Sequence, residues 1–340
     1  MKRNIFLACL FLIAASGAFG QANPVIRISQ DPANKKLDVF INDSLFTSLL
    51  YTDSLKKPVL FPVYAAGNIR ITRGWPLDPR NGEQIDHPHQ TGVWFNYGDV
   101  NGADYWNNST RVDSLKKLYG TIRLQKVINV NSAAGKGEFS IVSLWSDRIN
   151  GVVAEETTRF SFRVEGNIRT IDRETTVRAM KDILFRDNKE GLFAIRVSRE
   201  LEAPSQLNAK VYFKEPALKD GAKAGIPGGI YESSAGVKDE AVFATRSEWL
   251  KLSGKMEGRT VSVVIIDHPA NINYPGFWMA RGYGLFAVNP LGAEFYTNGK
   301  EKLNFRLKRG ENVTFKHRLV LAGELTDIQI KALADSFKAR

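Results

Sequence analysis

Cysteine is almost missing from this chain, in which Cys9 is the only one. Cys9 lies within the first 20 residues, which we expect to be removed, so the mature chain would carry no thiol. A chain of this kind forms no disulfide, has no thiol nucleophile and offers no thiolate to a metal ion. Its fold must rest on packing alone, which is feasible at this length.

Long hydrophobic runs are also missing after residue 20, whereas a membrane-spanning helix needs about 20 apolar residues. The start of the chain has a different pattern: Lys2 and Arg3 precede an apolar run over residues 5–15, and small residues lie just before Gln21. This pattern is typical of a secretory signal peptide. We therefore expect removal of a 20-residue signal peptide near Gln21 and a single periplasmic or secreted domain over residues 21–340.

No block of basic residues accompanies the net charge of +11, since the lysine pairs at 35–36, 56–57 and 116–117 are isolated from one another. A nucleic-acid-binding surface normally shows a basic stripe, so no nucleic-acid partner is expected. Scattered positive charge gives a mild attraction for anionic glycans instead. The sequence leaves the oligomeric state open.

Alternation of polar and apolar residues, the pattern of half-buried strands, dominates the chain. Residues 157–164 and 168–177 alternate on either side of a Glu-Gly-Asn turn and predict a β-hairpin. Residues 192–201 and 261–266 predict further strands, and residues 304–321 predict two more. Gly, Asn, Asp and Pro separate these segments at short intervals, as in all-β proteins.

One helix is predicted, at the C-terminus, where the capping-box pattern of residues 326–329 precedes an amphipathic tail. No linker divides the mature chain, which is too long for one simple sandwich of about 100 residues. The fold class predicted is therefore all-β: a large, double-sheet antiparallel β-sandwich of the supersandwich kind, with one short C-terminal helix. Two small sandwiches packed together are the alternative.

The stretch at residues 84–99 holds two of the four histidines, His87 and His89. Pro88 disfavours a helical conformation at His87, and residues two apart in an extended segment point to the same side. We expect the two rings to project together from a sheet edge or loop mouth, because Pro88 cannot donate to a strand ladder. Asp86 is expected to orient one of the rings from behind.

The surroundings of these histidines supply groups typical of a sugar site, in which aromatic faces stack on pyranose rings and charged groups hold hydroxyls. Gly98 and Gly102 would allow a close approach of the backbone. Each aromatic residue taken alone is more often a core residue. The neighbouring candidates are Arg73, Trp94, Asp99, Asp104 and Trp106.

A second stretch repeats the tripeptide Asp-His-Pro at residues 267–269, directly after the predicted strand 261–266. Strand ends commonly carry functional groups. The hypothesis is that His268 and Arg281 face the first stretch across a cleft. His317 lies in a regular strand pattern and is expected to be a core residue. Further candidates for ligand binding here are Trp278, Tyr283 and Asn289.

These stretches resemble the PmoA-like exported proteins of Bacteroidota, a family with a domain of unknown function. The sequence departs from that family at Gln90, where a third histidine is usual, and at Met279, where the family has a polar residue; both departures weaken a metal site. The matching motifs are Thr72-Arg73-Gly74-Trp75-Pro76, Asp86-His87-Pro88-His89 with Gly92-Val93-Trp94-Phe95, Gly98-Asp99-Val100-Asn101-Gly102, residues 187–193 and residues 274–292.

The resemblance implies a β-rich protein in a sugar-processing context, with an architecture like that of galactose mutarotase. The family's name refers to a methane monooxygenase subunit, which is embedded in the membrane by several helices. That activity is rejected, because the chain has no predicted span after its signal peptide.

Three functions fit the candidate residues. The first is an exported carbohydrate-active enzyme of isomerase, lyase or hydrolase type, in which an imidazole transfers protons. The second is a non-catalytic glycan-binding protein. The third is an enzyme with a divalent metal on His87, His89 and His268; no other cofactor is expected. The catalytic candidates are His87, His89, His268, Asp99 and Glu190, and those for binding a sugar, glycoside or oligosaccharide are Arg73, Trp94, Asp104, Trp106, Trp278, Arg281, Tyr283 and Asn289.

Overall fold

Two antiparallel sheets make up most of the computed structural model, which describes residues 24–113, 115–212 and 225–340. The larger sheet has nine strands. Its spatial order is β1 (Ile26–Asp31), β2 (Lys36–Ile41), β3 (Ser44–Leu50), β4 (Val59–Ala65), β6 (Val93–Tyr97), β12 (Gly191–Arg196), β17 (Leu285–Asn289) and β16 (Phe277–Arg281), with β5 (Ile69–Arg70) paired to β4.

The second sheet has eight strands, and two short strands pair separately. Its spatial order is β13 (Ile230–Ser233), β14 (Trp249–Met256), β15 (Arg259–Asp267), β19 (Asn312–Ala322), β10 (Ile168–Ala179), β9 (Gly151–Glu165), β8 (Lys136–Asp147) and β7 (Gly120–Ala133). The separate pair is β11 (Ile183–Phe185) with β18 (Phe305–Leu307), and the α-helices are α1 (Ala293–Tyr296) and α2 (Asp327–Lys338).

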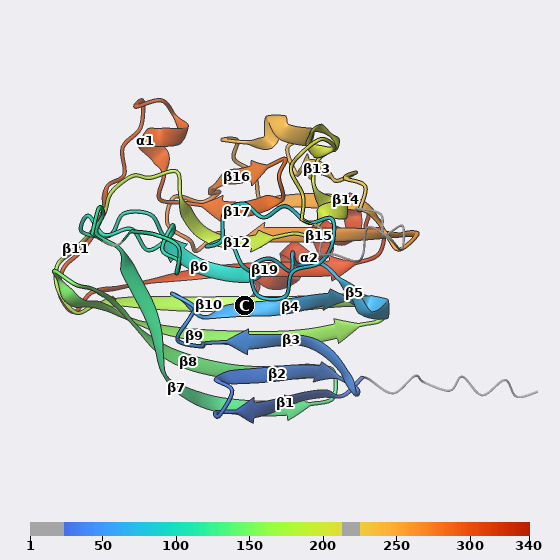
Figure 1. Cartoon of the computed structure of the whole chain (residues 1–340), viewed down its shortest axis with the longest axis horizontal. Coiled ribbons are helices and arrows are strands. Elements are labelled where there is room, and N and C mark those ends of the chain that lie inside the picture. The colour runs from blue at the N-terminus through green and yellow to red at the C-terminus, as the bar shows by residue number, and fades with distance from the viewer. Residues whose placement is uncertain (1–23, 114, 213–224) are drawn as a thin grey trace, which may run out of the picture.

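The two sheets are the two layers of a sandwich and share one core. In Figure 1 they extend from β1 and β7 at the lower edge to β16 and β13 at the upper edge. One hydrophobic core contains residues of both, for example Phe46 and Phe193 of the nine-stranded sheet with Phe162 and Leu319 of the other. The Phe46 and Phe162 rings meet edge to face at 6.0 Å. The predicted double-sheet antiparallel β-sandwich is confirmed.

Each sheet also buries residues on the face turned away from this core. Trp94, Ala194 and Met279 belong to a separate cluster on the nine-stranded sheet. On the eight-stranded sheet, Val264 and Phe337 belong to a third cluster, in which α2 packs against the strands. The candidate site lies beside the first of these outer clusters.

The sequence patterns identified several of the strands and the C-terminal helix. The predicted hairpin forms β9 and β10, residues 261–266 lie within β15, and residues 304–321 supply β18 and β19. The C-terminal helix begins after Thr326, whose side chain accepts from the backbone N–H of Gln329, with the reciprocal bond of a capping box also present. Residues 225–236, where glycine and serine favour a surface loop, contain the strand β13.

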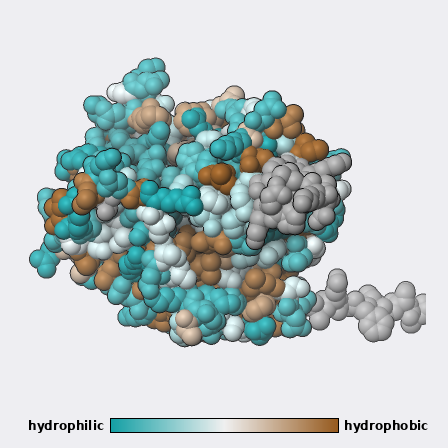
Figure 2. All heavy atoms as spheres, in the orientation of Figure 1, coloured by the Kyte–Doolittle hydropathy of each residue, from teal (hydrophilic) through white to brown (hydrophobic). Residues whose placement is uncertain are grey.

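The signal peptide, Cys9 and the expected cleavage near Gln21 lie outside the described residues. In the described parts of the chain, no helix is long and apolar enough to cross a membrane. On the face of the molecule that Figure 2 shows, hydrophobic side chains lie in small groups separated by hydrophilic ones.

Candidate functional site

Arg73 organises the loop that carries the first Asp-His-Pro motif. Its side chain is fully buried, and one guanidinium nitrogen donates to the backbone carbonyls of Gln84 (3.2 Å) and Asp86 (3.0 Å). The other donates to the carbonyls of His87 (3.1 Å) and Gln90 (3.0 Å). A side chain whose two terminal guanidinium nitrogens both bind one loop holds that loop's backbone. Arg73 is therefore a loop-positioning residue, not the ligand-facing residue that the sequence suggested.

Arg196 of β12 reaches the same loop from the neighbouring strand. It alternates with Ala194, so it lies on the outer face of the nine-stranded sheet. Its nitrogens donate to Asp86 Oδ1 (2.6 Å) and to the side-chain oxygen of Gln90 (2.6 Å). Gln90, which stands where the resembling family has a third histidine, thus completes the arginine-bound loop.

Two buried guanidinium groups converge on one carboxylate, because Arg73 also donates to Asp86 Oδ1 at 2.5 Å. Burial opposes the ionisation of Asp86, but the hydrogen bond with His87 and the charges of Arg196 and Arg73 outweigh it and hold its pKa well below the ordinary value. Burial, reinforced by the charge of Arg196, lowers the pKa of Arg73 to about 9. Asp86 is therefore an anion throughout the neutral range.

His87 presents its ring to solvent from this support. Its Nδ1 lies 2.5 Å from Asp86 Oδ2, and its side chain is 41% exposed. The ring stacks on Tyr283, with parallel planes and centroids 5.0 Å apart. The extended conformation expected at His87 is wrong, since its φ is +41°, in the left-handed region that non-glycine residues adopt rarely. The loop contacts described above hold this backbone.

His89 lies beside His87, with ring centroids 5.7 Å apart, so the two rings do lie together as expected. Burial, together with the positive charges of Lys57, His87 and the two arginines, lowers the pKa of His89 to about 2. The His89 ring is therefore neutral at neutral pH, and its Nε2 is a buried nitrogen without a hydrogen-bond partner among the described residues.

Lys57, two residues before β4, is buried beneath His89. Its ammonium donates to the His89 carbonyl at 2.8 Å and lies 5.4 Å from the Trp94 ring centre. Burial lowers the pKa of Lys57 to about 7, although the charge of Asp104 opposes the shift. Lys57 can thus gain or lose a proton near neutral pH.

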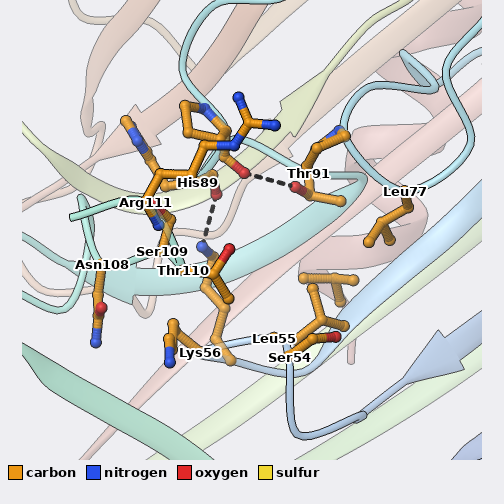
Figure 3. Close-up of a pocket in the computed structure, with 14 residues that line it drawn as sticks. Ser54, Leu55, Lys56, Leu77, His89, Thr91, Asn108, Ser109, Thr110 and Arg111 are labelled. Carbon is orange, nitrogen blue, oxygen red and sulfur yellow. Dashed lines mark hydrogen bonds between the residues drawn. The ribbon is translucent and has the colours of Figure 1, made fainter.

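A cavity of about 260 Å³ opens next to His89 and Lys57. Figure 3 shows Arg111 and His89 on one side of it and Ser54, Leu55 and Lys56 on the other. Its wall combines hydroxyl and amide groups with apolar surface and basic side chains. The lining residues are Ser54, Leu55, Lys56, Lys57, Val59, Pro76, Leu77, Pro88, His89, Thr91, Asn108, Ser109, Thr110 and Arg111.

Asp104 and Glu190 form a second polar cluster on the same outer face. Asn107 donates to both carboxylates, and Lys117 donates to Asp104 at 2.6 Å. Burial raises the pKa of Glu190, although the hydrogen bond from Asn107 opposes the shift. Asp104 is nearly fully buried, so this group holds the loop between β6 and β7 in place.

The predicted aromatic platforms are buried. Trp94 and Trp106 pack together with ring centroids 5.3 Å apart in the outer cluster, 0% and 1% exposed. Trp278 is also fully buried, and its indole N–H donates to Ser247 at 2.7 Å. These three side chains cannot stack on a ligand in this structure. Tyr283, which is partly exposed against His87, is the aromatic face at the site.

His268 does not join the first motif, so the expected common pocket is wrong. It follows β15 of the eight-stranded sheet, and its ring meets Phe337 of α2 edge to face at 5.0 Å. The first motif is held by β12 on the outer face of the other sheet. His317 is fully buried and stacks on Phe193 at 5.0 Å, which confirms the core assignment.

The remaining candidates lie apart from the two histidines. Arg281 is exposed and stacks over Phe243 at 4.3 Å. Asn289 is buried and donates to the carbonyls of residues 188 and 189. Asp99 accepts from the backbone of Gly102 at 2.8 Å and has Arg186 at 3.6 Å, as part of a turn.

The three-histidine metal set is not assembled, because His268 lies on the other sheet. Across the described ranges, no group of three or more His, Cys, Asp or Glu side chains could hold a metal ion.

A family model described as "Family of unknown function (DUF6807)" matches residues 36–335. The chain belongs to this family. The match does not carry the PmoA-like name suggested by the sequence motifs, and no curated protein sequence matches the chain.

Several solved structures are similar to this DUF6807 member in outline. The GH36 alpha-galactosidase AgaB from Geobacillus stearothermophilus is 10% identical with a TM-score of 0.42, over 88% of this chain and 41% of the galactosidase. A galactose mutarotase-like protein from Lactobacillus casei ATCC 334 is 12% identical with a TM-score of 0.33, over 87% of this chain and 99% of that one. The chain thus spans about two fifths of the galactosidase.

Sequence reasoning missed several residues of the candidate site, among them Arg196 and Lys57. Arg196 was visible as a charged residue in the alternating segment 192–201, which was predicted as a strand but forms β12 only as far as Arg196. Lys57 had no comparable signal, because a lysine before an apolar strand is ordinarily a surface residue. Its burial depends on the loops of residues 88–91 and 108–111, which are distant in sequence.

Proposed function

We propose that this protein is an exported carbohydrate-active enzyme in which His87 transfers protons to and from a sugar. The observation that carries the proposal is the Asp86–His87 pair: an exposed imidazole whose Nδ1 is bound by a carboxylate that two buried arginines hold ionised. A carboxylate at Nδ1 fixes the tautomer and leaves Nε2 free for proton transfer.

The residues have distinct roles in this proposal. His87 takes a proton at Nε2 from a sugar hydroxyl or an acidic C–H and returns it later, while its Nδ1–H donates to Asp86. Arg73 and Arg196 position Asp86 and the loop. Tyr283 holds the imidazole plane by stacking and offers an aromatic edge beside it.

The cavity next to the His87 loop, which is lined by Pro88 and His89 but not by His87 itself, supports a sugar as the ligand. Its volume of about 260 Å³ falls just below the range typical of drug-sized ligands, which suits one sugar ring. Ser54, Thr91 and Asn108 offer hydroxyl and amide groups for sugar hydroxyls, and Leu77 and Val59 offer apolar surface for ring C–H groups.

A non-catalytic glycan-binding protein is the second candidate, favoured by the hydroxyl-rich cavity wall alone. This function requires no proton transfer by His87. Replacement of His87 should therefore abolish turnover if the protein is an enzyme, and should leave ligand binding intact if it only binds glycans.

The test is a panel of free sugars and methyl glycosides incubated with wild type, His87→Gln and the control His268→Gln, followed by NMR for turnover and binding. The enzyme proposal expects turnover that is at least 100-fold slower in His87→Gln, with ligand binding retained, and unchanged in His268→Gln. Binding without turnover by the wild type would favour the glycan-binding protein. Equal turnover in wild type and His87→Gln would contradict the role given to His87.

A further inference from the structure

The cavity beside His89 has basic side chains and no acidic ones. Lys56, Lys57 and Arg111 line it, and no Asp or Glu is among its lining residues. Within the described residues, none of these three cations forms an ion pair with a carboxylate. Cations without a paired carboxylate around a cavity favour an anion inside it.

Lys57 is the most informative of the three because it is only 5% exposed. Its ammonium donates to one carbonyl, that of His89 at 2.8 Å, whereas an ammonium has three protons to donate. The groups that face it are the His89 carbonyl, the Trp94 ring and, at longer range, the carboxylate of Asp104, which itself binds Lys117. A buried cation with spare donors is costly unless a ligand completes its shell.

Arg111 lies across the cavity from the strand that follows Lys57. Its guanidinium stacks over the Trp75 ring at 4.7 Å, which leaves its N–H edge free to bind in the plane of the group. A planar guanidinium pairs with a carboxylate through two parallel hydrogen bonds. Arg111 can therefore orient a carboxylate through paired hydrogen bonds, and Lys57 offers that carboxylate a buried positive charge.

From this arrangement we infer that the cavity binds an acidic sugar, of the uronic acid class, with the sugar carboxylate between Lys57 and Arg111. The inference rests on the proposed sugar function and narrows its substrate class. The uncharged part of the ring would contact Leu55, Leu77 and Pro76, while Thr91 and Asn108 bind its hydroxyls. His89 also lines this space.

A proton balance gives the inference a specific signature. In the protein without ligand, burial lowers the pKa of Lys57 to about 7, so the residue is only partly protonated at neutral pH. A carboxylate placed beside the amine favours its charged form and raises the pKa. Binding of the acidic sugar should therefore take up a fraction of a proton at pH 7.5, and less at pH 6, where the amine is already protonated.

The experiment compares methyl β-D-glucuronide with methyl β-D-glucoside by isothermal titration calorimetry in two buffers of different ionisation enthalpy. The glucuronide is expected to bind at least tenfold more tightly than the glucoside, with proton uptake at pH 7.5. Lys57→Met and Arg111→Gln should each weaken glucuronide binding at least tenfold, and Lys57→Met should abolish the proton uptake. Lys116→Gln, an exposed lysine outside the cavity, is the matched control.

Acetate and sulfate are tested as competitors of the glucuronide, because they carry negative charge without a sugar ring. Equal affinity for glucuronide and glucoside would overturn the acidic-sugar inference and leave the proposed enzyme intact. Competition by acetate or sulfate at the same concentration as glucuronide would also overturn it, because the cavity would then be a simple anion site. Unchanged glucuronide affinity in both variants would remove the cavity as the place of binding, whereas failure of the proposed function is judged separately by the turnover of His87→Gln.

Discussion

His87 and Tyr283 stack with parallel rings 5.0 Å apart, although 196 residues separate them in the chain. The two stretches singled out in the sequence therefore do meet, but through a tyrosine and not through the second Asp-His-Pro motif. Arg196 also packs its guanidinium 4.8 Å from the centre of the Tyr283 ring. One tyrosine thus contacts both the exposed imidazole and one of the arginines that support it.

The two Asp-His-Pro motifs predict opposite effects of the same substitution. His87→Gln should change the melting temperature little, because the ring is exposed, and should lower any turnover at least 100-fold. His268→Gln should lower stability by about 1 kcal/mol, since the ring packs on Phe337, and leave turnover unchanged. Thermal unfolding and turnover of both variants check this; a turnover loss in His268→Gln would contradict the separation of the two motifs.

Asp86→Asn should destabilise the protein by about 3 kcal/mol, because two buried arginines would lose their carboxylate. The pKa of Asp86 is lower in the folded chain than its ordinary value of 3.8, so its stabilising effect is complete above about pH 4 and is lost as the pH falls further. The variant should therefore lose less stability than wild type on acidification below pH 4, as measured by urea unfolding.

Asp172→Asn is the matched control for Asp86→Asn. Asp172 is a buried carboxylate on the eight-stranded sheet and is bound by Arg318 at 2.6 Å. It should show a comparable loss of stability with turnover and ligand binding intact. Loss of binding in both variants at a temperature where both are folded would argue that Asp86 has no particular role at the site.

His317→Phe should flatten the dependence of stability on pH. Burial, with the charges of Arg173 and His268, lowers the pKa of His317 to about 3, while an unfolded histidine has its ordinary value of 6.5. Between these values the unfolded chain binds the extra proton, so stability rises with pH. Replacing His317 removes this titrating group, so the slope of the unfolding free energy against pH should fall by about 1.4 kcal/mol per pH unit between pH 3.5 and 6.

The phenylalanine can keep the stacking on Phe193 that His317 makes. Urea unfolding of wild type and variant at several pH values measures the two slopes. Equal slopes would mean that His317 becomes protonated inside the folded protein, beside Asp267 at 3.7 Å.

Lys57→Met should make the protein more stable at pH 7 than wild type, with an advantage that shrinks toward pH 10. The pKa of Lys57 is lowered from 10.5 to about 7 on folding, so in this window the unfolded chain holds the proton and wild-type stability rises with pH. The variant lacks this dependence. Denaturant unfolding at pH 7, 8.5 and 10 checks it, and Lys116→Met at an exposed position is the control; a constant difference between variant and wild type would show that Lys57 keeps its ordinary pKa.

Periodic patterns were enough to predict the fold. Strands such as residues 168–177 alternate because one face meets the core, and that relation is local in sequence. The capping box at Thr326 is equally local, and it identified α2. The proximity of His87 to His89 and the support from Asp86 also followed from neighbouring residues.

The rest of the site could not be predicted, because it depends on which strands become neighbours. Pairing of β6 with β12 brings Arg196 to Asp86, and no periodicity specifies that pairing. The expectation for His268 failed for the same reason: β15 joined the other sheet. The tryptophans were indistinguishable from core residues by composition, and the structure buries Trp94, Trp106 and Trp278.

The two arginines that hold the Asp86 loop are made at different times during synthesis of the chain. Asp86 is synthesised 110 residues before Arg196, the second of its two cationic partners. A nascent chain that has emerged only as far as β10 therefore carries both histidines of the loop and Arg73, but lacks the counter-charge from β12. On a ribosome, the loop that carries His87 would lack its contact with Arg196 until β12, the seventh strand of the nine-stranded sheet in chain order, has been made, and its stacking on Tyr283 until later still.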